Sequence, residues 1–151
     1  MKVVEMCKIS FLLINPSLQS DINLGLDVIE EVLSGLGVQV DRYDLLSRST
    51  ILRKKYDFVG VSFITPMNFF NIYKIKHLLE RGIIKIAGGA GVSNPLPISS
   101  FFDIFIIGEG EKPLRKIIEY WRQSGKEREV FLTKVSHIPK VYVPSLYSSQ
   151  I

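Results

Sequence analysis

Short apolar runs alternate with segments of helical periodicity along most of this chain, and this alternation limits the folds that it can adopt. The runs, rich in β-branched residues, cover residues 8–14, 58–64, 83–87 and 103–107, while residues 38–43 alternate apolar with polar side chains. Between them, apolar residues recur at intervals of three and four, as on one face of a helix. Strands that alternate with helices predict a parallel sheet with crossover helices on both faces.

The predicted fold is therefore α/β, a doubly wound parallel sheet of five strands of the flavodoxin-like type. Residues 8–14 form a continuous apolar run, as a strand covered on both faces does, so we expect this strand at the centre of the sheet. The alternating residues 38–43 fit an edge strand.

The first expected helix has the clearest signal, because apolar residues at positions 22, 26, 29, 33 and 36 share one face. Ser20 or Asp21 is its expected N-cap, and Gly37 its expected end. A second helix is expected over residues 67–81, and a last one ends at Gly125.

The length of 151 residues suits one domain. Residues 1–125 hold all the strand and helix signals and are expected to form the α/β domain. From residue 126 onward the periodicity fades, and Pro139 and Pro144 each bias the preceding residue away from helix. Residues 126–151 are therefore expected to form an extended tail or linker.

The cysteine and histidine residues exclude several kinds of site. Cys7 is the only cysteine, and one thiolate cannot form an internal disulfide or hold a zinc ion or an iron–sulfur cluster. His77 and His137 have no evident nucleophile beside them. The sequence therefore predicts neither a catalytic residue nor a set of protein ligands for a metal ion.

Hydropathy and charge point to a soluble protein. No apolar run approaches the roughly 18 residues that a membrane span needs, so we expect a cytoplasmic chain without a membrane partner. The formal charge is +4, and part of the excess lies in residues 53–55 and 112–128. No basic run is interleaved with aromatic residues, which argues against nucleic acid as a partner.

Small and polar residues follow the ends of four expected strands, where a doubly wound sheet binds its ligands. Glycine lets a ligand approach the backbone closely, and small polar side chains form hydrogen bonds without filling the space. The four connections begin at residues 15, 62, 88 and 108, and we expect them to form one crevice. The candidate ligand-binding residues are Asn15, Ser17, Ser62, Thr65, Gly88, Gly89, Ala90, Gly108, Glu109 and Gly110.

Familiar motifs of this fold class are absent from the sequence. A dinucleotide-binding fingerprint needs Gly-x-Gly-x-x-Gly after the first strand, where this chain has Asn-Pro-Ser, and Pro113 stands where a third glycine would follow Gly108-x-Gly110. There is no Gly-Lys-Ser/Thr phosphate loop and no Gly-x-Ser-x-Gly nucleophile elbow. Ser62 and Ile107 occupy the places where a phospho-aspartate receiver has aspartate and lysine.

The order of the glycine-rich elements resembles the amino-terminal cobalamin-binding domain of radical S-adenosylmethionine enzymes. The resemblance covers roughly residues 9–121. It rests on Gly88-Gly89, Pro95 or Pro97, Asp103 before a short strand, and Gly108-Glu109-Gly110-Glu111 before an amphipathic helix. It implies that the corrin lies over the carboxyl edge of the sheet, and that the nucleotide tail passes Ser62, Gly88 and Gly89.

The resemblance also implies how cobalamin would be held. Many such domains carry Asp-x-His-x-x-Gly after the first strand, but residues 15–21 contain no histidine. The lower face of the cobalt would then be left to water or to a side chain other than histidine. The iron–sulfur cluster of the family belongs to the catalytic barrel, which residues 126–151 would connect to the domain.

Three functions remain open from the sequence. The first is a cobalamin-binding module that serves a radical S-adenosylmethionine catalytic barrel, in cis or in trans, and is not catalytic alone. The second is a domain of the same fold that has lost the cofactor and acts as a docking surface. The third is a nucleotide-binding protein that uses helix amino ends and glycine loops to hold phosphate.

Overall fold

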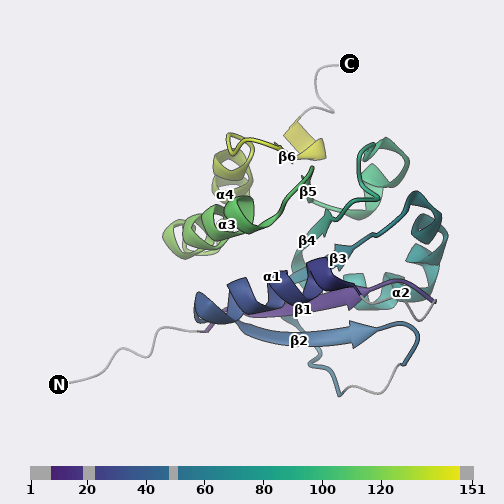
Figure 1. Ribbon diagram of the computed structural model, residues 1–151. Helices are drawn as coiled ribbons and strands as arrows, with labels where there is room; N and C mark the ends of the chain where they lie inside the picture. Colours follow the sequence, from purple (N-terminus) through teal and green to yellow (C-terminus); the bar gives the residue numbers. More distant parts are fainter. Residues whose placement is uncertain (1–7, 19–22, 48–50, 147–151) are drawn as a thin grey trace.

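The computed structural model describes residues 8–18, 23–47 and 51–146, and Figure 1 shows helices packed against a single sheet. The strands are β1 (Ser10–Asn15), β2 (Gln39–Asp44), β3 (Tyr56–Ser62), β4 (Gly82–Gly88), β5 (Ile104–Ile106) and β6 (Val141–Tyr142). The α-helices are α1 (Leu24–Gly35), α2 (Ile72–Leu79), α3 (Glu111–Ser124) and α4 (Arg128–Val135). Three 3₁₀ helices complete the fold, η1 (Pro66–Asn71), η2 (Leu96–Phe101) and η3 (Pro144–Leu146).

The sheet confirms the α/β prediction and changes two of its details. The strand order is β2-β1-β3-β4-β5-β6, with β1 to β5 parallel and β6 antiparallel to β5. The described sheet thus has six strands instead of five. The strand β1 is interior but not central, because β3 lies in the middle of the five parallel strands. A continuous apolar run shows only that both faces of a strand are covered, which holds for every interior strand.

Two helix boundaries also differ from the prediction. Ser20 and Asp21, the expected caps of the first helix, lie outside the described residues, and the N-cap of α1 is Asn23, whose Oδ1 accepts a hydrogen bond from Leu26 N–H at 3.1 Å. The expected helix over residues 67–81 divides into η1 and α2. Thr65 caps η1 by accepting from Met67 N–H at 3.1 Å.

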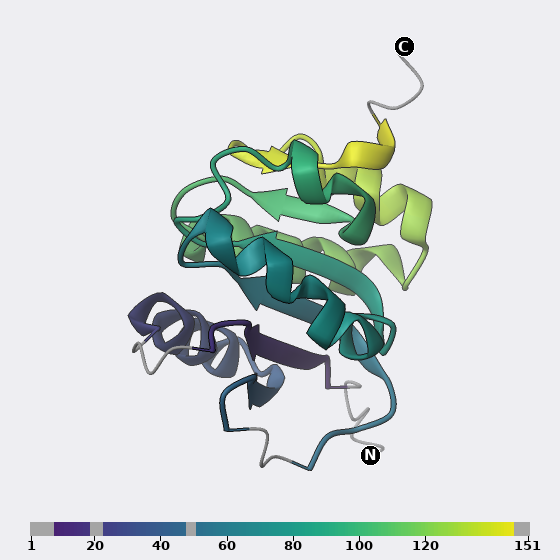
Figure 2. The same cartoon turned by 90° about the vertical axis from the view of Figure 1, so that its right-hand side faces the viewer.

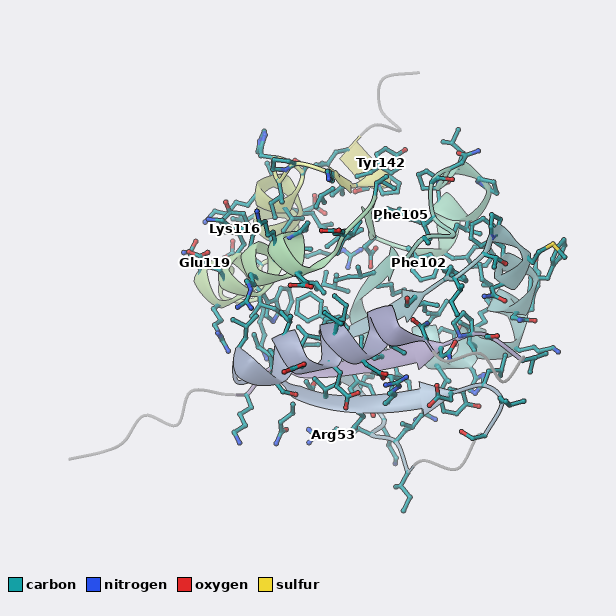
Figure 3. All side chains as sticks on the ribbon, viewed as in Figure 1. Arg53, Phe102, Phe105, Lys116, Glu119 and Tyr142 are labelled. Atoms are coloured by element: carbon teal, nitrogen blue, oxygen red, sulfur yellow. The ribbon has the colours of Figure 1, made fainter. Side chains whose placement is uncertain are left out.

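Helices cover both faces of the sheet and give the molecule two apolar cores. In Figure 2, η1 and α2 lie in front of the strands and α3 lies behind them. The core beneath α1, α3 and α4 contains Phe11, Phe58 and Trp121. The other core, beneath α2, contains Phe63, Phe102 and Phe105, and Figure 3 shows Phe102 and Phe105 close to Tyr142 of β6. The doubly wound arrangement is therefore confirmed.

The segment after Gly125 is not the extended tail that the sequence predicts. Residues 128–135 form α4, whose Phe131 is fully buried with its ring 4.9 Å from Trp121 and 6.0 Å from Phe58. Among residues 126–146, the part of this segment that the structure describes, β6 is the one strand, and it pairs with β5. The apolar residues of α4 are few and lie among charged ones, so their helical periodicity is weak in the sequence. Residues 128–143 nevertheless share the core beneath α1 and α3.

The burial of Phe131 gives a stability prediction for the segment after Gly125. We expect Phe131→Ala to lower the free energy of unfolding by about 3–5 kcal/mol, since a large buried ring is lost and a cavity remains. The matched control is Val130→Ala, one residue away and exposed, which should change it by less than about 0.5 kcal/mol. Denaturant unfolding of both variants measures this difference. Equal stability of the two variants would show that α4 does not belong to the core.

Candidate functional site

A cavity of about 470 Å³ opens at the carboxyl edge of the sheet, between the strands and helices α1 and α3. Strands β1, β3, β4 and β5 form its floor, α1 forms one wall, and the β5–α3 connection forms another. Its lining comprises Phe11, Leu13, Gly25, Leu26, Val28, Ile29, Gly60, Val61, Ser62, Ile86, Gly88, Gly89, Ala90, Ile106, Gly108, Glu109, Gly110, Glu111 and Leu114.

The cavity exists because side chains on this face of the sheet become smaller toward the carboxyl edge. Alternate residues of a strand share a face, so Phe58, Gly60 and Ser62 of β3 all point toward α1 and α3. The neighbouring strand β4 follows the same order with Ile86 and then Gly88. At the amino end, the rings of Phe58, Trp121 and Phe131 fill the space between sheet and helices. At the carboxyl end, the small residues leave it open.

The glycines of the cavity are needed for different reasons. A Cβ on Gly60 would lie 2.7 Å from Cε1 of Phe11, so Gly60 makes room for that ring. Gly89 has φ +100°, and a Cβ there would overlap the carbonyl oxygen of Phe63. In contrast, a Cβ on Gly88 would make only ordinary contact, 3.7 Å from the carbonyl oxygen of Ile106. Of these three glycines, Gly88 is therefore the one that the fold itself does not require.

The connection between β5 and α3 brings polar groups to the mouth of the cavity. Gly108 has φ +92°, which turns the chain, and α3 begins at Glu111 with no side-chain cap. The N–H groups of the first turn of an uncapped helix can donate to a ligand oxygen. The carboxylates of Glu109 and Glu111 lie in the same lining and can accept hydrogen bonds.

The remaining lining is mostly apolar and uncharged. Within the described part of the chain, the lining contains no lysine, arginine or histidine. A ligand with several negative charges would meet the carboxylates of Glu109 and Glu111. A nearby cation is Lys140, whose Nζ would lie 3.9 Å from a Cβ on Gly108. The cavity is thus suited to a largely neutral ligand that has an apolar end.

The structure brings seven of the ten sequence-predicted residues together around this cavity. They are Ser62, Gly88, Gly89, Ala90, Gly108, Glu109 and Gly110. The other three lie outside its lining. Ser17 N–H donates to Oδ1 of Asn15 at 3.2 Å, and Nδ2 of Asn71 donates to the carbonyl oxygen of Pro16 at 2.8 Å, so these contacts hold the connection after β1 against η1. Thr65 is occupied as the cap of η1.

Sequence reasoning missed the contribution of α1 and of mid-strand residues. Leu26 and Ile29 belong to the apolar helix face that the sequence predicts, and both line the cavity, although neither was among the candidate ligand-binding residues. Gly60 interrupts a buried strand, and a glycine at such a position often marks a close approach. Gly60 could therefore have indicated, from the sequence alone, that β3 contributes to the floor of the cavity.

The tyrosine with the largest pKa shift, Tyr56, lies outside the cavity. Burial raises the pKa of Tyr56 to about 12, and a 2.7 Å hydrogen bond to Asp41 adds to this effect. Tyr56 begins β3, at the amino edge of the sheet, opposite the cavity mouth. His77 and His137 are exposed and do not line the cavity. Within residues 8–18, 23–47 and 51–146, no group of three or more His, Cys, Asp or Glu side chains could hold a metal ion.

A helix that spans a membrane needs about 18 or more largely apolar residues. None of the helices formed by the described residues has the length and apolar character needed to cross a bilayer.

Comparison with known proteins identifies relatives of the chain. The family model described as "Radical SAM proteins, N-terminal" matches residues 43–144. No curated protein matches the sequence. Among solved structures, the chain is similar to the radical S-adenosylmethionine methyltransferase TsrM from Kitasatospora setae with cobalamin and a 4Fe–4S cluster bound, with a TM-score of 0.68 and 20% identity. The match covers 90% of this chain and 29% of the methyltransferase.

A second structure of the methyltransferase, with tryptophan substrate and an S-adenosylmethionine analogue bound, matches with a TM-score of 0.66 and 20% identity. That match covers 89% of this chain and 28% of the other. At this identity the likeness is one of fold. The chain spans less than a third of the length of these structural relatives.

The contrast between Gly88 and Gly89 can be tested directly. We expect Gly89→Ala to destabilise the fold by about 1–3 kcal/mol or more, since its φ is positive and the added Cβ meets backbone. Gly88→Ala should stay within about 1 kcal/mol of the original, because the new methyl group makes only ordinary van der Waals contact with Ile106. Thermal or denaturant unfolding gives both values. A loss at Gly88 as large as that at Gly89 would contradict the assignment of Gly88 to the cavity.

Proposed function

We propose that this chain, which belongs to the family of N-terminal segments of radical SAM proteins, binds cobalamin at the carboxyl edge of its sheet. In this proposal the chain is a binding module and the reaction is carried out by a radical SAM catalytic barrel, in cis or in trans. The cavity between the sheet, α1 and α3 is the observation that carries the proposal.

The size and position of the cavity support a ligand with a tail. About 470 Å³ is within the usual range of small-molecule sites, roughly 300–1,000 Å³. A corrin ring with its amide side chains is too large for it, whereas the nucleotide tail of cobalamin can enter. The corrin would then remain outside, above the ends of the parallel strands, which is the usual ligand position in such sheets.

The chemistry of the lining fits the two ends of such a ligand. The apolar side chains of Leu13, Ile86 and Ile106 can bury the aromatic base of the tail. The carboxylates of Glu109 and Glu111 can accept hydrogen bonds from the carboxamide groups around the corrin. The N–H groups at the start of α3 can donate to an oxygen of the tail.

The cobalt would be bound without a histidine ligand from this chain. His77 and His137 do not line the cavity, and the connection after β1 has no histidine at residues 15–18. Bound cobalamin would supply a methyl group carried on cobalt. This chain's own residues would bury the tail, orient the corrin and leave its upper face open toward the catalytic barrel. The iron–sulfur cluster would belong to that barrel.

One alternative has an observation in its favour. A domain of this fold that has lost cobalamin and serves only for docking would also lack a histidine after β1. The third possibility, a nucleotide-binding protein, is opposed by the rim, where Glu109 and Glu111 would repel a polyphosphate.

Titration with hydroxocobalamin or methylcobalamin tests the proposal. We expect spectral changes that saturate at micromolar or higher concentration, because the histidine ligand and the covering barrel are absent and less surface is buried. Gly88→Leu should reduce the affinity at least about tenfold, since its side chain enters the cavity. The matched control is Gly35→Leu, at the exposed end of α1, where a Cβ meets nothing within 4 Å.

His77→Ala and His137→Ala should leave the titration unchanged. Absence of any spectral change with the folded wild-type chain would favour the alternative without cofactor. Loss of binding in either histidine variant would show that the site lies elsewhere.

A further inference from the structure

Two segments of the chain contain no charged residue although they reach the surface. Residues 58–73 and 86–102 contain no Asp, Glu, Lys or Arg, whereas charged residues make up 23% of the chain. Surface helices normally carry charges on their outer side. Helix α3 does so, and Figure 3 shows Lys116 and Glu119 on its outer side.

The two uncharged segments lie side by side. Gly91 N–H donates to the carbonyl oxygen of Phe63 at 2.8 Å, and a Cβ on Gly91 would lie 2.6 Å from the carbonyl carbon of Thr65. Farther along, the rings of Tyr73 and Phe101 are 6.1 Å apart. The outer surfaces of η1, the start of α2 and η2 are therefore continuous.

Large apolar side chains project from this joint surface. Met67, Phe70, Tyr73 and Leu96 have exposed fractions between 68 and 76%. Met67 and Phe70 are three residues apart and so lie on the same side of η1, a 3₁₀ helix with three residues per turn, and Tyr73 follows in the first turn of α2. We call these four residues the uncharged patch. Single exposed apolar residues are ordinary, but a group of them on one surface is typical of an interaction surface.

We infer that the uncharged patch is a docking surface for the catalytic part of a radical SAM protein. Interface cores are depleted in charged residues and enriched in aromatic residues and methionine, which describes the patch. Segment η1 follows the carboxyl end of β3, so the patch begins at the edge where the cavity opens. A partner seated there would reach the site of the proposed corrin.

The length of the relatives supports this choice of occupant. Less than a third of each matched methyltransferase chain aligns with this domain, so such a domain is accompanied by a much larger body of protein. The inference rests on the proposed function for the identity of the partner but does not require cobalamin to be bound. A second copy of this chain is the competing occupant.

Binding to a radical SAM polypeptide tests the docking surface. The probe is the radical SAM catalytic segment that carries a Cys-x-x-x-Cys-x-x-Cys motif, prepared as a separate polypeptide whether it belongs to the same protein as this chain or to another. We expect a one-to-one complex in sedimentation velocity, weakened at least about tenfold by the double change Met67→Ser and Phe70→Ser. Val130→Ser is the control, because Val130 is an exposed apolar residue on α4, outside the patch.

Three outcomes would overturn the inference. They are equal binding by the double variant and the wild type, no complex with the wild type, or self-association of the wild type that the double variant abolishes. The last would assign the patch to a second copy. Cobalamin titration of the double variant separates this inference from the proposed function, because unchanged cobalamin binding with lost docking shows that the two sites are distinct.

Discussion

The decrease in side-chain size along the parallel strands, on the face toward α1 and α3, is the feature on which the site depends. At the amino edge, Phe11 stacks on Phe58 at 5.3 Å, and Trp121 and Phe131 close the core above them. This packing holds the helices at a fixed distance from the sheet. Gly60 then accommodates the edge of the Phe11 ring, and Gly88 and the small residues beyond it leave the space between sheet and helices open at the carboxyl edge. The space between the sheet and helices α1 and α3 is thus a packed core at the amino edge and an open cavity at the carboxyl edge.

Most of the sheet could be predicted from the sequence, since four of the parallel strands carry an apolar run between turn residues and β2 alternates apolar with polar residues. The sequence predicted the part of the cavity that the connections after the strands form, because glycine and small polar residues at those positions can be recognised in the sequence itself. What was missed depends on tertiary contacts. Helix α4 is stabilised by the burial of Phe131 against Trp121, and β6 by pairing with β5, and neither has a strong local pattern. The cap Asn23 was missed because two equally good capping residues precede it.

The two faces of the sheet are suited to different tasks. The face toward α1 and α3 contains the cavity, and the outer surfaces of these helices are charged, as solvated helices are. The face toward α2 has a closed core in which Phe63 contacts Phe69 and Phe102 at 5.2 and 5.9 Å. Its outer surface includes the uncharged patch. A ligand on one side and a partner on the other would meet at the shared carboxyl edge, which is where a module that presents a cofactor needs both.

If cobalamin binds as proposed, its nucleotide tail enters the cavity and contributes to the affinity. The most direct test compares the affinity of the chain for cobalamin with its affinity for cobinamide, which has the same corrin and lacks that tail. We expect cobalamin to bind at least about tenfold more tightly than cobinamide, which corresponds to about 1.4 kcal/mol from burial of the tail. Equal affinity for the two molecules would show that the cavity contributes nothing to binding and that the tail does not enter it.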